Sequence, residues 1–286
     1  MEDLHSSMVT VYTPASQMRT PGLLVRSMWR DLAASRELSW RLFIRDLSAQ
    51  YRQSVLGVLW TFAPPIVTSL IFIVLQSKRV ISFGETDIPY PVYVLVGAIL
   101  WQVFAESLQA PLKSVTAAKP MLAKINFPRE ALIVSAIFSV LFAMLIRLVV
   151  ILGALVIFQF PVTWGFLLAF LPVLMLLLLG ICVGLLLTPF GMLYADVGTS
   201  LPVVTQLLFF VTPVVYPPPQ FFPLSLITKL NPVSPLLVGA RDLITKGTIE
   251  LSAPLLTVGG MTVLFLLLGW AVYRVALPIV IERMSA

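Results

Sequence analysis

The chain has 286 residues, of which 59% are hydrophobic and 11% are charged, and its formal net charge is +6. Soluble domains carry roughly 25% charged residues, so this composition and a mean hydropathy of +0.98 exclude a water-soluble globular protein. The basic residues lie in loops beside apolar runs, so the positive charge indicates membrane topology rather than nucleic-acid binding.

Six apolar runs are mostly about as long as the roughly 20 residues that a helix needs to cross a bilayer. They lie near residues 57–76, 90–110, 131–158, 164–193, 201–216 and 255–279. Lipid offers the backbone no hydrogen bonds, and a closed barrel would show short alternating strands instead of long apolar runs. We therefore predict an all-α integral membrane fold with six transmembrane helices within residues 55–281.

The first 36 residues predict an N-terminal tail. Residues 1–56 are too polar to form the apolar core of a secretory signal, so we expect no cleaved leader. His5 is the only histidine and Cys182 the only cysteine, and one residue of each type predicts neither a metal site nor a disulfide within the chain.

Residues 37–54 predict an amphipathic helix on the inner membrane surface. At about 100° per residue, Arg41, Arg45 and Arg52 share one narrow arc. A second arc is apolar and would enter the acyl boundary; it holds Trp40, Ile44, Leu47 and Tyr51. Two interpretations stay open for the arginines: an anchor that follows the positive-inside tendency, or a guanidinium patch that binds phosphate on a lipid-linked substrate.

Charge asymmetry predicts the orientation. Thirteen lysines and arginines lie on the side that holds both termini, five lie on the opposite side, and Arg147 lies inside a span. The positive-inside tendency therefore places both termini in the cytoplasm.

Two intramembrane features are unusual. Pro64 and Pro65 predict a kink in the first span because proline lacks a backbone donor. Glu106 and Arg147 are ionisable groups inside spans, but counting the helical rise separates them by about 15 Å along the membrane normal. We predict no direct pair, and Arg147 then either lines a conduit or bonds to carbonyls of neighbouring helices.

Four sequence stretches resemble the membrane subunit of polysaccharide-exporting ABC transporters, the ABC-2 type permeases of O-antigen, capsule and teichoic acid export. They are RDLSAQYRQSVLGVLW at 45–60, INFPRE at 125–130, FFVTPVVYP at 209–217 and LNPVSPLLVGARDLI at 230–244. The resemblance covers most of residues 36–280. Gln50 departs from it because a basic residue is frequent there, and Ala195 replaces the arginine that often precedes the acidic position held by Asp196.

The resemblance implies that residues 116–127, between the second and third spans, form a coupling helix that docks on an ATPase. The residues implied in coupling are Lys119, Met121, Leu122, Lys124 and Ile125. An ordinary positive-inside loop is the alternative. Residues 217–250 contain several prolines yet are too apolar for a free loop, so we expect two short re-entrant helices there. The resemblance makes them the outer gate, whereas an interfacial hairpin without a gating role is the alternative.

Aromatic side chains are candidates to line a conduit on which sugar faces slide, although membrane-interface belts and ordinary packing are the alternatives. The candidate lining residues are Trp60, Trp101, Phe104, Arg147, Phe209, Phe210 and Tyr216.

The sequence contains no G-x-x-x-x-G-K-[ST], so ATP and Mg²⁺ would bind a partner chain and this chain would be no enzyme. The interpretation is a homodimer paired with two ATPase subunits that exports a lipid-linked polysaccharide across the inner membrane. An ion-coupled secondary transporter of a lipid or glycolipid is the alternative and would place carboxylates at mid-membrane. A membrane glycosyltransferase or phosphatase would need a carboxylate or histidine cluster that the sequence lacks.

Overall fold

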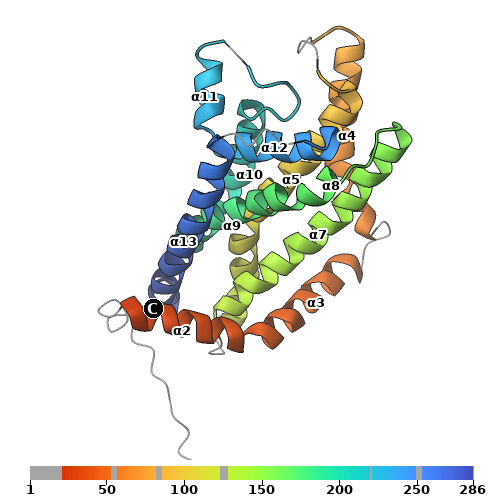
Figure 1. The fold of residues 1–286 in the computed structure, drawn as a ribbon. Coiled ribbons are helices and arrows are strands. Elements are labelled where there is room, and N and C mark those ends of the chain that lie inside the picture. Colours follow the sequence, from red (N-terminus) through yellow and green to blue (C-terminus); the bar gives the residue numbers. More distant parts are fainter. Residues whose placement is uncertain are drawn as a thin grey trace, which may run out of the picture.

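The computed structural model describes residues 21–52, 57–81, 86–122, 128–219, 221–248 and 253–285. Within these ranges every regular element is a helix, which confirms the all-α fold (Figure 1). The elements are α2 Pro21–Ala34, α3 Arg36–Arg52, the 3₁₀ helix η1 Gly57–Thr61, α4 Ala63–Ser77, α5 Tyr90–Ala117, α6 Lys119–Leu122, α7 Glu130–Ile157, α8 Gly165–Leu168, α9 Phe170–Leu193, α10 Ala195–Val211, α11 Leu224–Leu230, α12 Val233–Lys246 and α13 Ala253–Ser285.

Four helical stretches in the described residues are long and apolar enough to cross a bilayer. They are Tyr90–Ala117, Glu130–Ile157, Gly165–Leu193 and Ala253–Leu277, and each coincides with a predicted apolar run. Helices α4 and α10 are also apolar but have only 15 and 17 residues. The count of six spans therefore stays a prediction.

Pro64 and Pro65 do not kink a continuous first span, so that prediction was wrong. The apolar run divides into η1 and α4, and the prolines lie in the first turn of α4. The first-turn N–H groups of a helix have no partner within the helix, so proline loses nothing there.

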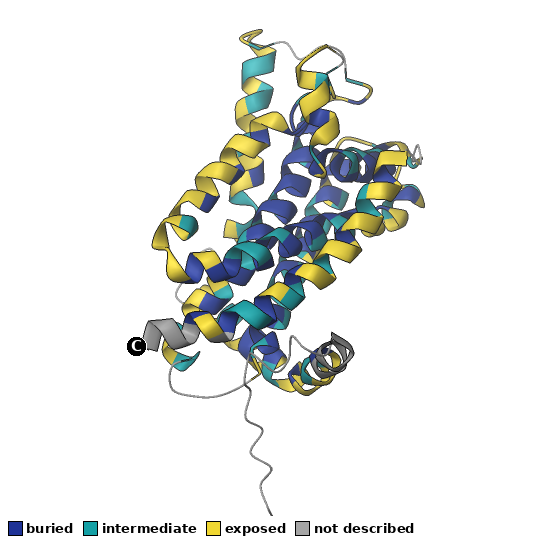
Figure 2. Cartoon of the chain, turned by 90° about the vertical axis from the view of Figure 1, so that its left-hand side faces the viewer, coloured by how far each residue is buried: buried dark blue, intermediate teal, exposed yellow. Residues whose placement is uncertain are grey.

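Helix α5 is the centre of the bundle. In its most apolar 18-residue window 78% of the residues are buried, against 17% in the corresponding window of α13. Figure 2 shows buried residues along the middle of the molecule and exposed ones on the outer helices. Exposed apolar side chains on the outer helices are what a bilayer solvates, so this distribution agrees with a membrane protein.

Glycines allow α9 to approach α5 closely. A Cβ added at Gly180 would lie 2.5 Å from Ser107 Cβ, and one at Gly184 would lie 2.4 Å from the Leu108 carbonyl oxygen. Helices in lipid associate through close packing of small residues because apolar burial gives them little driving force. The spacing of four residues places both glycines on one face of α9, against α5.

The sequence analysis missed helix α2, which lies within the predicted N-terminal tail. Trp29 packs edge-on against Trp270 of α13 with ring centroids 6.1 Å apart. Arg274 Nη2 lies 2.5 Å from Asp31 Oδ2, and Arg274 Nη1 lies 2.6 Å from Glu130 Oε1. One guanidinium thus joins α2, α7 and α13 at the end of the bundle that holds the C-terminus (Figure 1).

Glu106 and Arg147 form a direct pair, which contradicts the prediction that they lie too far apart. Arg147 Nη1 donates to Glu106 Oε2 at 2.7 Å and Nη2 donates to Oε1, and the Arg147 side chain is 1% exposed. Helix α5 continues to Ala117, seven residues beyond the predicted run, which places Glu106 deeper. The remaining offset is about six residues or ~9 Å, and the long arginine side chain and the oblique course of α7 (Figure 1) close it.

We expect Arg147→Met to destabilise the fold by roughly 3–5 kcal/mol because it leaves the Glu106 carboxylate uncompensated at membrane depth. The double variant Arg147→Met with Glu106→Leu should recover most of that loss, since it removes both charges. Urea or thermal unfolding of the detergent-solubilised chain measures this. A double variant as unstable as the single one would contradict the account.

Candidate functional site

Helix α3 packs against α7 through a face that the sequence analysis did not identify. Ser39, Leu42 and Phe43 are buried, and Phe43 contacts the rings of Phe138 and Phe142 on α7. Trp40 and Ile44 of the predicted apolar stripe remain 54% and 41% exposed. The helix therefore has an apolar stripe available to lipid in addition to the face that packs on the protein. The predicted helix end at 53–54 lies outside the described residues.

The three arginines of the stripe are all exposed on α3. Arg41 Nη2 lies 2.6 Å from Glu37 Oε1, and Arg45 Nη2 lies 2.7 Å from Asp46 Oδ1. Exposed pairs contribute little stability, and a guanidinium has five N–H donors. Arg41 and Arg45 can therefore exchange these carboxylates for the oxygens of a phosphate at small cost.

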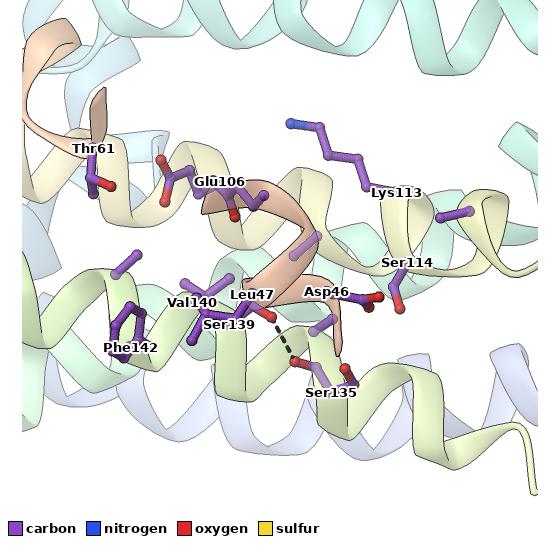
Figure 3. A pocket seen from close by; sticks show the side chains of 15 residues that line it. Asp46, Leu47, Thr61, Glu106, Lys113, Ser114, Ser135, Ser139, Val140 and Phe142 are labelled. Carbon is purple, nitrogen blue, oxygen red and sulfur yellow. Dashed lines mark hydrogen bonds between the residues drawn. The ribbon is translucent and has the colours of Figure 1, made fainter. Parts of the chain in front are cut away.

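A cavity of about 450 Å³ lies between α3, η1, α5 and α7 (Figure 3). Asp46 and Gln50 reach it from α3, Glu106 and Lys113 from α5, and Ser139 from α7. The position Gln50, where the chain departs from the pattern that it resembles, is thus on the cavity wall. Nothing in the spacing of these residues could have predicted the cavity, because it depends on how far α3 leans from α5.

The predicted coupling segment contains a short helix, α6, between α5 and α7. Met121 and Leu122 are half-buried against the main hydrophobic core, and Lys119 Nζ lies 3.4 Å from the Met192 carbonyl oxygen. Lys124 and Ile125 lie outside the described residues. The segment is at the same end of the bundle as α2 and the C-terminus (Figure 1).

Two short helices, α11 and α12, occupy the predicted outer segment at the opposite end of the bundle, as expected (Figure 1). Arg241 fixes α12 to its neighbours. It is 2% exposed, its Nη2 donates to the carbonyl oxygens of Pro213 and Val214 at 2.9 and 2.8 Å, and its guanidinium carbon lies 3.8 Å from the centroid of the Tyr93 ring.

The sequence analysis missed this role of Arg241, although the signal was present. Arg241 follows the uncharged run 236–240 and precedes Asp242, Leu243 and Ile244, so it is a cation in a mostly apolar segment, where burial requires hydrogen bonds. Tyr93 strengthens the same junction because its hydroxyl donates to the Tyr216 carbonyl oxygen at 2.9 Å. One cluster therefore joins α5, the bend at 212–216 and α12.

An exposed ion pair ties the end of α12 to the loop before α5. Lys246 Nζ lies 2.8 Å from Asp87 Oδ2 and 3.1 Å from Asp242 Oδ1. The hydrogen bond from Lys246 lowers the pKa of Asp87, and the hydrogen bond to Asp87 raises the pKa of Lys246. Because the pKa of Asp87 is depressed, the ion pair contributes to folding stability at pH values above 3.8, the ordinary pKa of this carboxyl group. That contribution is lost as the pH falls through the depressed pKa.

The candidate conduit residues fall into two groups. Trp101, Phe104 and Phe209 are buried and pack on one another, with ring centroids 5.4 Å apart for Trp101 and Phe104 and 5.9 Å apart for Trp101 and Phe209. Trp60 and Phe210 are 61% and 55% exposed. Tyr216 is half-buried, and Arg147 is engaged with Glu106. A conduit between two chains would take its lining from the exposed group.

The comparisons with known proteins agree on one family. The ABC-2 type transporter family matches residues 37–245. The O-antigen export system permease protein RfbA of Myxococcus xanthus is 28% identical over 248 residues, which cover 85% of this chain and 92% of that protein. RfbA of Klebsiella pneumoniae is 26% identical over 216 residues, covering 72% of this chain and 79% of that protein.

The family match runs from α3 to α12 and so includes α6 and α11. Membership of this family implies a multi-pass membrane protein that works together with an ABC ATPase. Its members are permease subunits and carry out no enzymatic reaction themselves. The chain therefore belongs to the ABC-2 type transporter family.

Proposed function

We propose that this chain is the permease subunit of an exporter that moves a lipid-linked polysaccharide, such as an O-antigen-like glycan, across the inner membrane. The observation that carries the proposal is the similarity to O-antigen export permeases over most of both chains. Both termini would lie in the cytoplasm, in agreement with the excess of basic residues on that side.

Energy would come from a separate ATPase, present in two copies with ATP and Mg²⁺, because the sequence has no P-loop motif. Two copies of the permease would form the conduit between them, since a twofold homodimer is the commonest oligomer. An ion-coupled transporter is not favoured. It needs a carboxylate at membrane depth that can exchange its charge partner, whereas Glu106 is already held by Arg147 through two hydrogen bonds.

The exposed arginines of α3 would bind the phosphate of the lipid carrier. Their placement on one arc of a helix that also exposes Trp40 and Ile44 keeps the cations at headgroup level while the apolar side chains enter the bilayer. Met121 and Leu122 pack on the main core with part of each side chain, and the exposed part would rest against the ATPase. Helices α11 and α12 would form the outer gate.

Replacement of Met121 and Leu122 by Asp should release the ATPase during purification, because two charges would enter an apolar groove. The expected result is loss of most of the ATPase from affinity-purified permease, measured by gel densitometry. Ala33→Asp on α2 is the control and should retain it. Full retention in the double variant would remove the coupling role of α6.

Arg41→Gln with Arg45→Gln should lower glycan-stimulated ATP hydrolysis by about 5- to 10-fold, since charge-assisted hydrogen bonds to phosphate contribute roughly 1.5–3 kcal/mol before solvent screening. Arg36→Gln removes one positive charge from the opposite side of α3 and should leave the rate near wild type. Equal rates of ATP hydrolysis in the wild type, the double variant and the Arg36→Gln control, at equal membrane insertion, would reject phosphate binding by the arginine stripe.

Arg241→Met should loosen the outer segment because the Pro213 and Val214 carbonyls lose their donor. Hydrogen exchange followed by mass spectrometry should show faster exchange by at least tenfold in peptides covering 208–219 and 233–246. Lys229→Met on α11 removes an exposed cation and should not change it. Unchanged protection in Arg241→Met would show that this arginine does not hold the gate segment.

A further inference from the structure

The cavity between α3, η1, α5 and α7 has the volume of a small-ligand site. Its volume of about 450 Å³ is within the range of roughly 300–1,000 Å³ that such sites occupy. Gln50 and Lys113 are exposed at its rim, whereas Ser135 in its wall is 1% exposed. The cavity therefore extends from an accessible rim into the packed bundle.

The two carboxylates in the cavity wall already have basic partners. Asp46 pairs with Arg45 and Glu106 pairs with Arg147, so neither carboxylate requires a metal ion or a ligand cation. Their oxygens retain lone pairs that accept hydrogen bonds, and the Glu106 side chain is 33% exposed toward this space. Two carboxylates in the wall oppose a phosphate group, while they suit a neutral ligand that donates hydrogen bonds.

The hydroxyl groups of the wall add further acceptors. Ser114 Oγ donates to the Leu132 carbonyl oxygen at 3.0 Å, and Ser139 Oγ donates to the Ser135 carbonyl oxygen at 3.0 Å (Figure 3). With their protons so engaged, both oxygens offer only lone pairs to a ligand. The Gln50 amide and the Lys113 ammonium supply donors, so the ligand needs groups that both donate and accept.

The remaining wall is apolar and mostly small. Ala110, Ala136 and Ala143 leave space between α5 and α7, and the Phe142 ring and Val140 offer apolar surface. A pyranose ring has this combination of surfaces, with hydroxyl groups at its edge and C–H groups on its faces.

We propose that this cavity is a saccharide site that takes one sugar unit of the lipid-linked glycan before export. The inference rests on the proposed function for its substrate and adds a place within a single chain where the sugar binds. Arg45 connects the two sites, because it pairs with Asp46 of the cavity wall and belongs to the exposed stripe that would hold the carrier phosphate.

The experiment measures glycoside binding to the full chain in lipid nanodiscs without ATPase, by saturation-transfer NMR. The probes are the methyl and dodecyl β-glycosides of glucose, galactose, mannose and N-acetylglucosamine, with dodecyl tetraethylene glycol ether as the control for the alkyl tail. At least one methyl glycoside should bind. Ala136→Phe, which fills the cavity, and Asp46→Asn, which removes an acceptor charge without changing size, should each weaken binding by at least tenfold.

Thr257→Phe on the exposed face of α13 is the matched control and should bind as wild type, and thermal melting identifies any variant that fails to fold. Tighter binding of the dodecyl glycoside than of the methyl glycoside supports a lipid-linked sugar as the ligand. Equal binding of the two glycosides overturns the lipid-linked sugar as the ligand. Binding by no glycoside, binding insensitive to both variants, or variant-sensitive binding of inorganic phosphate alone overturns the site.

The two proposals fail separately. Nucleotide-driven glycan export by the permease with its ATPase, without glycoside binding to the cavity, rejects the saccharide site and leaves the proposed function standing. Cavity-dependent glycoside binding without such export rejects the proposed function and leaves the site.

Discussion

The pair of Arg147 and Glu106 is the interaction on which the arrangement of the bundle depends. The Arg147 side chain is 1% exposed, so its charge depends on a protein partner. The two hydrogen bonds between them join α7 to α5 where the two helices cross. That crossing in turn separates α5 from the end of α3, and the cavity lies in the space between them.

The same principle operates at both ends of the molecule. Arg274 satisfies two carboxylates from α2 and α7 at one end, and Arg241 satisfies two backbone carbonyls of the 212–216 bend at the other. Each guanidinium joins segments that lie far apart in sequence and so ties the helices at its end of the molecule to one another.

Hydropathy predicted the helical class and six spans, four of which coincide with helices long and apolar enough to cross a bilayer, because length and apolarity determine whether a segment can lie in lipid. Proline breaks in an apolar segment predicted the two short helices at 217–250. Hydropathy could not predict contacts between helices. The pair of Glu106 and Arg147 was not predicted because the apolar composition placed the end of the second span at residue 110. Helix α5 continues to Ala117, through a stretch that includes polar residues. Helix α2 was missed because its stability depends on Trp270 and Arg274, which are more than 200 residues away.

The candidate site was predictable in the positions of single residues on a helix, but not in the contacts between helices. Periodicity placed Arg41 and Arg45 on one exposed arc of α3, as the structure shows, but it did not identify the buried face of Ser39, Leu42 and Phe43. Aromatic side chains could not be divided into packed and exposed groups without the fold, since Trp101 and Phe209 are as aromatic in sequence as Trp60. The cavity wall combines residues of α3, η1, α5 and α7 and has no signature in any one of them.

We propose that this chain moves a glycan only with energy from a separate ATPase. The direct measurement is translocation of a fluorescently labelled lipid-linked glycan in liposomes that contain the purified permease, with and without its ATPase subunit and ATP. The account predicts transport only when permease, ATPase and ATP are all present. Uphill transport by the permease alone, driven by an ion gradient, would contradict it.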